Sequence, residues 1–295
     1  MKRLLIPIIL AFFVCAAYGA DTVSSVVVMR EQLDNRSIPT DIIFRSADNW
    51  LLYSYVEGKV TEYNGNKPGK VYQSQNLKDG VCLVELDGAI YFCDSKNRSL
   101  RLLNKDYSLI RTIRAAPDRA PFDPTDVVKV NAGLYYVVDN DNHRILLMTP
   151  QDGKFADQWG GMGIGRGRLR YPFSAVVDKT SLLYVTDVLN TRVQMFAPNG
   201  RGTLEIGDWG VEPGQFYRPK GLALINDKYL VVSDGYLGVL QVFDVYGTFI
   251  GVVADERGAV RKYSSPTRIR AYGNRIAVLD YYEGLLEIIS LSGLQ

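Results

Sequence analysis

The stretch Leu182-Leu-Tyr-Val-Thr-Asp187-Val-Leu-Asn190-Thr-Arg192-Val-Gln-Met-Phe196 decides the fold, because the chain repeats its pattern. An apolar strand ends at an aspartate, a short turn contains an asparagine, and a second apolar strand begins with an arginine. The segment 134–148 has all of these features, and weaker copies occur elsewhere. The residues that end the first strand of each copy are Ser54, Asp94, Asp139, Asp187, Asp234 and Asp280.

Copies at steps of 40 to 48 residues predict an all-β fold, a six-bladed β-propeller with four-stranded antiparallel blades. Two-residue turns such as Asp87-Gly88 and Asn226-Asp227 suit tight hairpins, because these residues tolerate positive φ. The innermost strand of a blade follows a proline in five units, and the expected ranges are Thr40–Ser46, Thr125–Val130, Phe173–Asp178, Lys220–Ile225 and Thr267–Ala271.

The last unit ends after its third strand, so one outer strand is missing. Val23–Arg30 is rich in valine and has no unit of its own. We therefore expect this N-terminal strand to join the last blade and close the ring, which leaves no open seam.

The first twenty residues have the pattern of a secretory signal peptide. Lys2 and Arg3 precede an apolar run, and small residues precede Asp21. A permanent anchor is the alternative, but the run is shorter than the roughly 20 residues that span a bilayer. We expect residues 1–20 to be a signal peptide and residues 21–295 to be an exported propeller, periplasmic or extracellular, with no membrane insertion after cleavage.

Composition excludes several kinds of chemistry. The chain is 47% hydrophobic and 22% charged, and Lys2 and Arg3 account for its formal charge of +2, so we expect no nucleic-acid binding. One histidine and three cysteines are too few for a four-ligand zinc site of Cys and His. Cys82 and Cys93 face each other across the predicted Asp87-Gly88 hairpin, which favours a disulfide over two buried thiols.

The segment Asp139-Asn-Asp-Asn142-His143-Arg144-Ile145 resembles the NHL repeat, as do the connections at 165–172 and 210–219. The third to fifth units match the repeat well, whereas the first and sixth lack its asparagine and arginine. The resemblance implies a six-bladed propeller. It also implies a scaffold role, because exported bacterial relatives are often taken to be scaffolds in envelope complexes.

The polar residues of the repeat resemble an acid–base catalytic set, but we expect them to be structural. The Asp139, Asn142 and Arg144 set recurs as Asp187, Asn190 and Arg192, and recurrence indicates a structural role. His143 lies where the NHL repeat places a histidine, so we expect it to be structural or exposed. Propellers that resemble peptidyl-amidating lyases hold zinc with several histidines, which this chain lacks.

Residues at the starts of the innermost strands are expected to converge at the mouth of the channel. The favoured interpretation is a solvated polar funnel, with an ion pair between Asp41 and Arg268 across the closure. The alternative is a site for a small ligand, a cation or a partner. If the channel mouth binds a cation, the carboxylates of Asp41 and Asp126 are the oxygen ligands that would suit calcium. The residues of this predicted site are Asp41, Asp126, Ser174 and Arg268.

Arg166, Arg168 and Arg170 alternate with other residues in a glycine-rich connection. The spacing indicates an ordinary loop between blades, and an exposed contact for an acidic partner is the alternative. No strand-loop-helix context supports a nucleotide site.

We therefore expect an exported, monomeric, non-enzymatic propeller without a cofactor that binds another protein in the cell envelope or outside the cell. The alternative is a metal-dependent enzyme of the lactonase type at the channel mouth, and we cannot map the full ligand set of such enzymes onto this chain.

Overall fold

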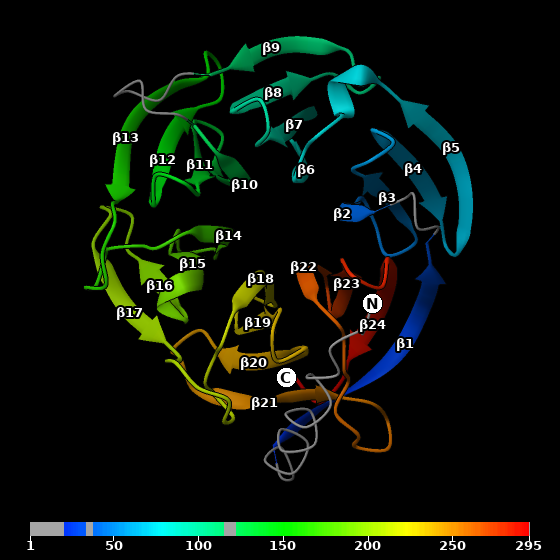
Figure 1. Cartoon of the computed structure of the whole chain (residues 1–295), viewed down its shortest axis with the longest axis vertical. Coiled ribbons are helices and arrows are strands. Elements are labelled where there is room, and N and C mark those ends of the chain that lie inside the picture. The colour runs from blue at the N-terminus through cyan, green and yellow to red at the C-terminus, as the bar shows by residue number, and fades with distance from the viewer. Residues whose placement is uncertain (1–20, 34–37, 115–121, 295) are drawn as a thin grey trace, which may run out of the picture.

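The computed structural model describes residues 21–33, 38–114 and 122–294. They form a ring of antiparallel blades around a central channel (Figure 1). The predicted signal peptide lies outside the described residues. Among the described residues, no helix has the length and hydropathy needed to span a membrane.

Each blade has its innermost strand at the channel and its outermost strand at the rim. Blade 1 contains β2 (Pro39–Phe44), β3 (Asn49–Ser54), β4 (Lys59–Asn64) and β5 (Lys67–Gln73). Blade 2 contains β6 (Cys82–Leu86), β7 (Ala89–Asp94), β8 (Ser99–Leu103) and β9 (Leu109–Ile113). Blade 3 contains β10 (Pro124–Asn131), β11 (Leu134–Asp139), β12 (Arg144–Thr149) and β13 (Lys154–Gly160).

The second half of the ring repeats this arrangement. Blade 4 contains β14 (Pro172–Val177), β15 (Leu183–Asp187), β16 (Arg192–Phe196) and β17 (Gly202–Ile206). Blade 5 contains β18 (Pro219–Ile225), β19 (Tyr229–Asp234), β20 (Val239–Asp244) and β21 (Phe249–Ala254). Blade 6 contains β22 (Pro266–Tyr272), β23 (Arg275–Asp280) and β24 (Leu285–Leu291), completed by β1 (Thr22–Gln32). Two short 3-10 helices are η1 (Gln75–Leu77) and η2 (Val188–Asn190).

The N-terminal strand closes the ring as expected. β1 pairs antiparallel with β24, from Ser25 opposite Leu291 to Gln32 opposite Leu285. Its first residues also pair in parallel with β21, where Thr22 lies opposite Val252. β1 thus joins blades 5 and 6 into one eight-stranded sheet, an extra connection that the sequence did not indicate.

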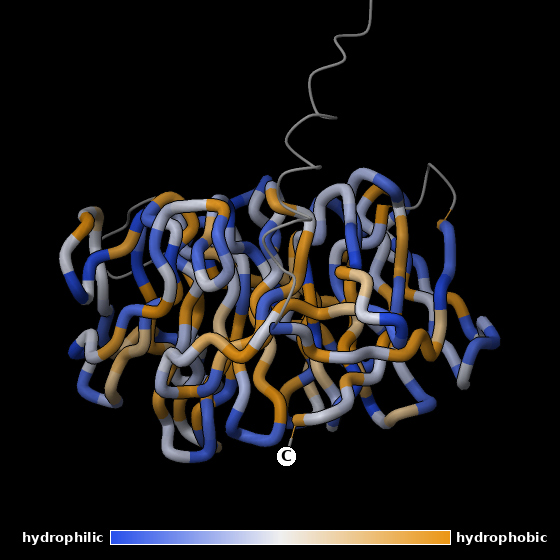
Figure 2. The backbone as a smooth tube through the Cα atoms, turned by 90° about the horizontal axis from the view of Figure 1, so that it is seen from below, coloured by the Kyte–Doolittle hydropathy of each residue, from blue (hydrophilic) through white to orange (hydrophobic). Residues whose placement is uncertain are grey.

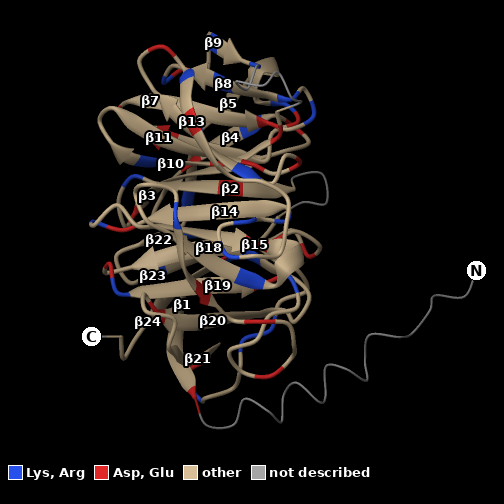
Figure 3. Ribbon diagram, turned by 90° about the vertical axis from the view of Figure 1, so that its left-hand side faces the viewer, with Lys and Arg blue, Asp and Glu red and all other residues tan. Residues whose placement is uncertain are grey.

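The core lies between adjacent blades. The second strand of each blade is apolar on both faces, whereas the outer strand β5 is almost wholly exposed. Side chains of neighbouring blades therefore interdigitate near the channel, and Figure 2 shows hydrophilic segments mostly in the loops of both faces. Lys, Arg, Asp and Glu also gather in these loops, while most strands carry few charges (Figure 3).

The predicted hairpin disulfide is confirmed. Cys82 on β6 lies opposite Cys93 on β7, with the Cα atoms 4.9 Å apart and the sulfurs bonded. The turn between these strands has positive φ at Asp87 and Gly88, as the sequence pattern predicts. The two cysteines are 11 positions apart in sequence, so the bridge closes a short loop and stabilises this one hairpin more than the ring.

We call the face where the innermost strands begin the top face, and the opposite one the bottom face. The loops that follow the strand-end aspartates also lie on the top face. Leu189 donates its backbone N–H to Arg170 O, Gly235 to Arg218 O, and Tyr281 to Ser265 O. In blades 4, 5 and 6 the same bond thus joins each loop to the residues before the innermost strand.

Candidate functional site

The four residues predicted at the channel mouth do converge near the axis. Asp41 is on β2, Asp126 on β10, Ser174 on β14 and Arg268 on β22, each the third residue of its innermost strand. The expectation of a solvated funnel is wrong, however, because all four side chains are buried. A partner approaching from the top face therefore does not reach them.

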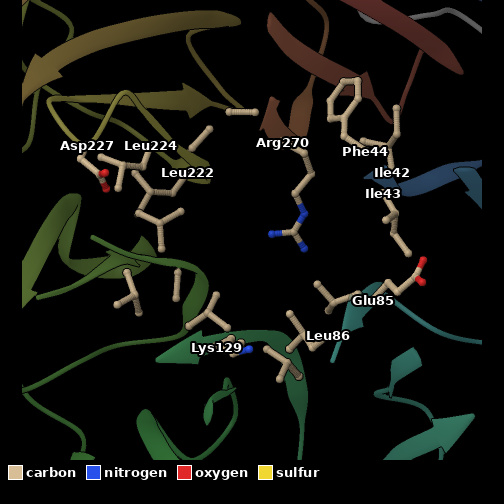
Figure 4. A pocket seen from close by; sticks show the side chains of 18 of the residues that line it. Ile42, Ile43, Phe44, Glu85, Leu86, Lys129, Leu222, Leu224, Asp227 and Arg270 are labelled. Atoms are coloured by element: carbon tan, nitrogen blue, oxygen red, sulfur yellow. The ribbon is translucent and has the colours of Figure 1, made fainter. Parts of the chain in front are cut away.

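Arg270, which the sequence analysis missed, is the centre of this buried layer. Its Nε and Nη2 donate to the two carboxylate oxygens of Asp41 at 2.9 and 2.8 Å. Its Nη2 and Nη1 also donate to Asp126 at 2.8 and 3.2 Å. Figure 4 shows the guanidinium projecting into the channel. The available signal was the alternation of β22, which puts Arg268 and Arg270 on the same side of the strand.

Arg268 completes the layer. Its Nη1 donates to Asp126 at 3.2 Å, and its Nη2 donates to the backbone oxygens of Thr125 and Val81. The predicted pair with Asp41 is present but long, at 3.9 Å between Nε and Oδ2. Ser174 Oγ donates to Asp126 at 2.9 Å. Two carboxylates and two guanidiniums therefore neutralise each other inside the ring.

The electrostatics follow from this pairing. Burial raises the pKa of Asp126, but Arg270 and Arg268 outweigh it and hold that pKa below its usual value. Burial lowers the pKa of Arg268, whereas the pKa of Arg270 is raised because Asp126 and Asp41 outweigh its desolvation. The layer is therefore a structural ion-pair network.

Calcium does not fit this layer. The oxygens of Asp41 and Asp126 are already bound by arginines, and a cation placed there would face two guanidiniums. Among the residues that the structure describes, no group of three or more His, Cys, Asp or Glu side chains could hold a metal ion. The interpretation of Asp41 and Asp126 as metal ligands is therefore not supported by their surroundings.

Below the layer, the channel widens into a cavity of about 620 Å³ that opens on the bottom face. Its walls carry mostly aliphatic side chains, including Val84, Val128 and Leu224, and Arg270 forms its inner end (Figure 4). Two of the charged groups at the rim are paired, since Glu85 binds Arg45 and Lys129 binds Asp87, while Asp227 accepts the backbone N–H of Lys179. The basic groups of the cavity, Lys129 and Arg270, are thus already held by carboxylates.

The aspartates of the repeat bind polar side chains of their own blade. Asp139 accepts from Asn142 Nδ2 at 3.0 Å and from Arg144 Nε at 2.8 Å. Asp187 binds Asn190 and Arg192 in the same way. The expected structural role is confirmed, because these carboxylates satisfy groups of their own blade.

His143 is structural as well. The ring is buried, its Nδ1 accepts the backbone N–H of Tyr171 at 3.1 Å, and the rings of His143 and Tyr171 meet edge to face. The histidine therefore links blades 3 and 4 instead of facing solvent.

The three arginines of the connection between blades 3 and 4 do not form one patch. Arg166 pairs with Glu205 at 3.4 Å, and Arg168 donates to Gly160 O at 3.0 Å. Arg170 is half-buried, and its backbone N–H donates to Asp187. The loop is tied to blade 4, because Gln194 also bonds its backbone. Contact with an acidic partner stays a prediction for Arg166, Arg168 and Arg170.

Exposed aromatic side chains gather on the top face of blades 4 to 6. Tyr217 and Tyr236 stack on each other at 4.0 Å, and each still exposes more than a third of its surface. The equivalent loops of blades 2 and 3 are polar, at 95–97 and 140–142. Within two residues of a strand-end aspartate or of the start of an innermost strand, the exposed apolar and aromatic residues of blades 4 to 6 are Tyr171, Leu189, Tyr217, Tyr236, Tyr281 and Tyr282.

The sequence analysis did not single out these residues. The available signal was position, since these residues follow the strand-end aspartates or precede the innermost strands. We call these six residues the aromatic surface. Clusters of exposed apolar side chains on a protein surface often mark interaction sites.

The fold and this geometry define the class of protein, a closed six-bladed β-propeller. Among solved structures, a virginiamycin B lyase from Staphylococcus aureus, crystallised with quinupristin, superposes with a TM-score of 0.66. It is 14% identical, and the match covers 91% of this chain and 100% of that one. This likeness concerns the fold alone.

Within that class, the chain is an NHL-repeat-like propeller. It is 23% identical over 117 residues to protein brain tumor of Drosophila melanogaster, covering 35% of this chain and 11% of that protein. It is 29% identical over 109 residues to the human E3 ubiquitin-protein ligase NHLRC1, covering 37% and 26%. The matches thus span a small part of either relative, and no family model matches the chain.

Proposed function

We propose that this protein is an exported, non-enzymatic module that binds another protein through the aromatic surface. The observation that carries the proposal is the gathering of exposed aromatic side chains on the top face of three adjacent blades. Tyrosine is enriched in protein interfaces, because its ring buries apolar area while its hydroxyl stays hydrogen-bonded. Export is proposed from the signal-like residues 1–20.

The charged groups near the axis favour binding over catalysis. Asp41, Asp126, Arg268 and Arg270 are mutually neutralised, so none is free to act as a general acid, a base or a metal ligand. We therefore do not propose the metal-dependent lactonase that the sequence left as an alternative.

Quantitative isolation from the native host tests the proposal. Tagged full-length protein is recovered from envelope and secreted fractions, as wild type and as the double variant Tyr217→Ala/Tyr236→Ala. The control is Tyr246→Ala/Tyr272→Ala, which removes two exposed tyrosines from the bottom face. We expect one partner, recovered in constant ratio with wild type and control, to fall at least tenfold with the top-face variant. Recovery of a partnerless monomer, or equal loss in both variants, contradicts the proposal.

A further inference from the structure

A pocket of about 260 Å³ lies on the top face between blades 3, 4 and 5. It contains two basic side chains and no acidic one. Its lining residues are Asn140, Tyr171, Val188, Leu189, Arg218 and Lys220. The arrangement differs from the buried layer beside it, where every cation has a carboxylate.

Lys220 carries a charge that the described part of the chain leaves without a counter-ion. Its Nζ lies 4.4 Å from the centre of the Phe173 ring, and no ion pair forms between it and any described residue. Burial, with Arg218 and Arg268 nearby, lowers its pKa to about 8. Arg218 is exposed and likewise forms no ion pair within the described residues. A poorly hydrated cation without a counter-ion destabilises the fold, so an anion from outside would relieve this cost.

The strand-end aspartates of blades 4 and 5 are already occupied. Asp234 accepts the backbone N–H groups of Tyr217, Arg218, Tyr236 and Leu237. Asp187 binds Arg192 and Asn190 and accepts the N–H of Arg170. Neither carboxylate can turn to Lys220 without leaving buried donors unpaired.

The walls of the pocket indicate what carries the anion. Tyr171 and Leu189 expose 39% and 45% of their surface beside Lys220. Tyr217 directly precedes Arg218 in sequence and stacks on Tyr236 on the same face. A small inorganic anion would neutralise Lys220 but leave this apolar surface in water. A peptide that contains a carboxylate can neutralise Lys220 and also bury the exposed apolar surface.

We infer that the pocket binds the carboxylate of an aspartate or glutamate side chain, flanked by apolar residues, in a segment of a partner protein. The inference rests on the proposed function, since it assigns the chemistry by which the aromatic surface recognises its partner. Lys220 and Arg218 hold the carboxylate, and Tyr171 and Leu189 contact the flanking side chains.

The test uses the full mature protein and two end-blocked tripeptides, phenylalanyl-glutamyl-phenylalanine and its glutamine analogue, with inorganic phosphate as a third ligand. Binding is measured by titration calorimetry on wild type, Lys220→Met and Arg218→Ala. The control is Lys179→Met, an exposed lysine at the bottom end of β14.

We expect wild type and the control to bind the glutamyl peptide at least tenfold more tightly than the glutaminyl peptide. Lys220→Met should reduce this ratio to below about twofold, and Arg218→Ala should reduce it in part. The ratio in wild type should fall as the pH rises from 7 to 9.5, because Lys220 loses its proton. Cooperative melting at or above the wild-type temperature shows that the variants are folded.

Three results overturn the inference: equal affinity for both peptides in wild type, a preference that survives in Lys220→Met, or phosphate binding more tightly than the glutamyl peptide. If the pocket inference fails while partner recovery still depends on Tyr217 and Tyr236, the proposed function stands without it. If partner recovery is also indifferent to those tyrosines, both fail.

Discussion

Two pairs of basic side chains lie near the axis of this ring, and they have opposite surroundings. Arg268 and Arg270 of blade 6 are bound by the carboxylates of Asp41 and Asp126. Arg218 and Lys220 of blade 5 have no carboxylate partner among the described residues. The pKa of Arg270 is raised as a result, whereas that of Lys220 is lowered to about 8. Both pairs consist of basic residues, so the residue type does not explain the difference between them. The pair that has carboxylate partners stabilises the fold, and the pair that has none is available to bind a ligand.

Removing the central arginine gives the largest expected effect. Arg270→Met leaves Asp41 and Asp126 buried with too few donors, and breaking a buried pair costs about 3–5 kcal/mol. For a protein of this size, that corresponds to a fall in melting temperature of roughly 10 °C. Lys220→Met, measured in the same thermal denaturation by circular dichroism, should show no fall. An equal fall in melting temperature for the two variants would show that Lys220 stabilises the fold as much as Arg270 does, which contradicts the comparison.

Acid should lower the stability of the fold by protonating Asp126, which is paired with Arg268 and Arg270. The folded pKa of Asp126 lies below its usual value of 3.8, so its contribution to stability is present above pH 3.8 and is lost as the pH falls through the folded pKa. In urea unfolding between pH 4 and pH 2, the stability of wild type should therefore fall more steeply than that of Asp126→Asn. The titration of one proton limits this difference to at most about 1.4 kcal/mol per pH unit. Parallel slopes would contradict the pairing.

Lys220, which has no carboxylate partner among the described residues, should lower the stability of the fold at neutral pH, by less than Asp126 raises it. The folded pKa of Lys220 is about 8, below its usual 10.5, so the unfolded chain binds more protons between these values. The stability of wild type should rise with pH in this window relative to Lys220→Met. At pH 7 the variant should melt about 3 °C higher, because a desolvated charge is gone. A lower melting temperature for Lys220→Met would mean that the lysine has a stabilising partner.

Local patterns were enough to predict the fold. The repeat with its strand-end aspartates, the unassigned valine-rich strand and the cysteine pair across a hairpin each depend on short-range rules of strand alternation and turn chemistry. Pairing of β1 with blade 5 was not predictable in this way. It depends on how far an 11-residue strand extends past the end of β24.

The site was predictable only in outline. Topology places Asp41, Asp126, Ser174 and Arg268 together, but whether they meet water depends on Arg270, which fills the space between blades 1 and 3. Its partners are 229 and 144 residues away in sequence, so no local signal links them. The isolation of Lys220 becomes visible only when every nearby carboxylate has been assigned to its donors.

Site-specific photo-crosslinking in the native host tests the central claim most directly. A photoreactive amino acid replaces Tyr236 on the top face or Tyr246 on the bottom face, and the crosslinked peptides are identified by mass spectrometry. The account predicts one partner protein captured from position 236, through a segment that contains aspartate or glutamate beside apolar residues, and none from position 246. No adduct at 236, or the same adducts from both positions, would contradict it.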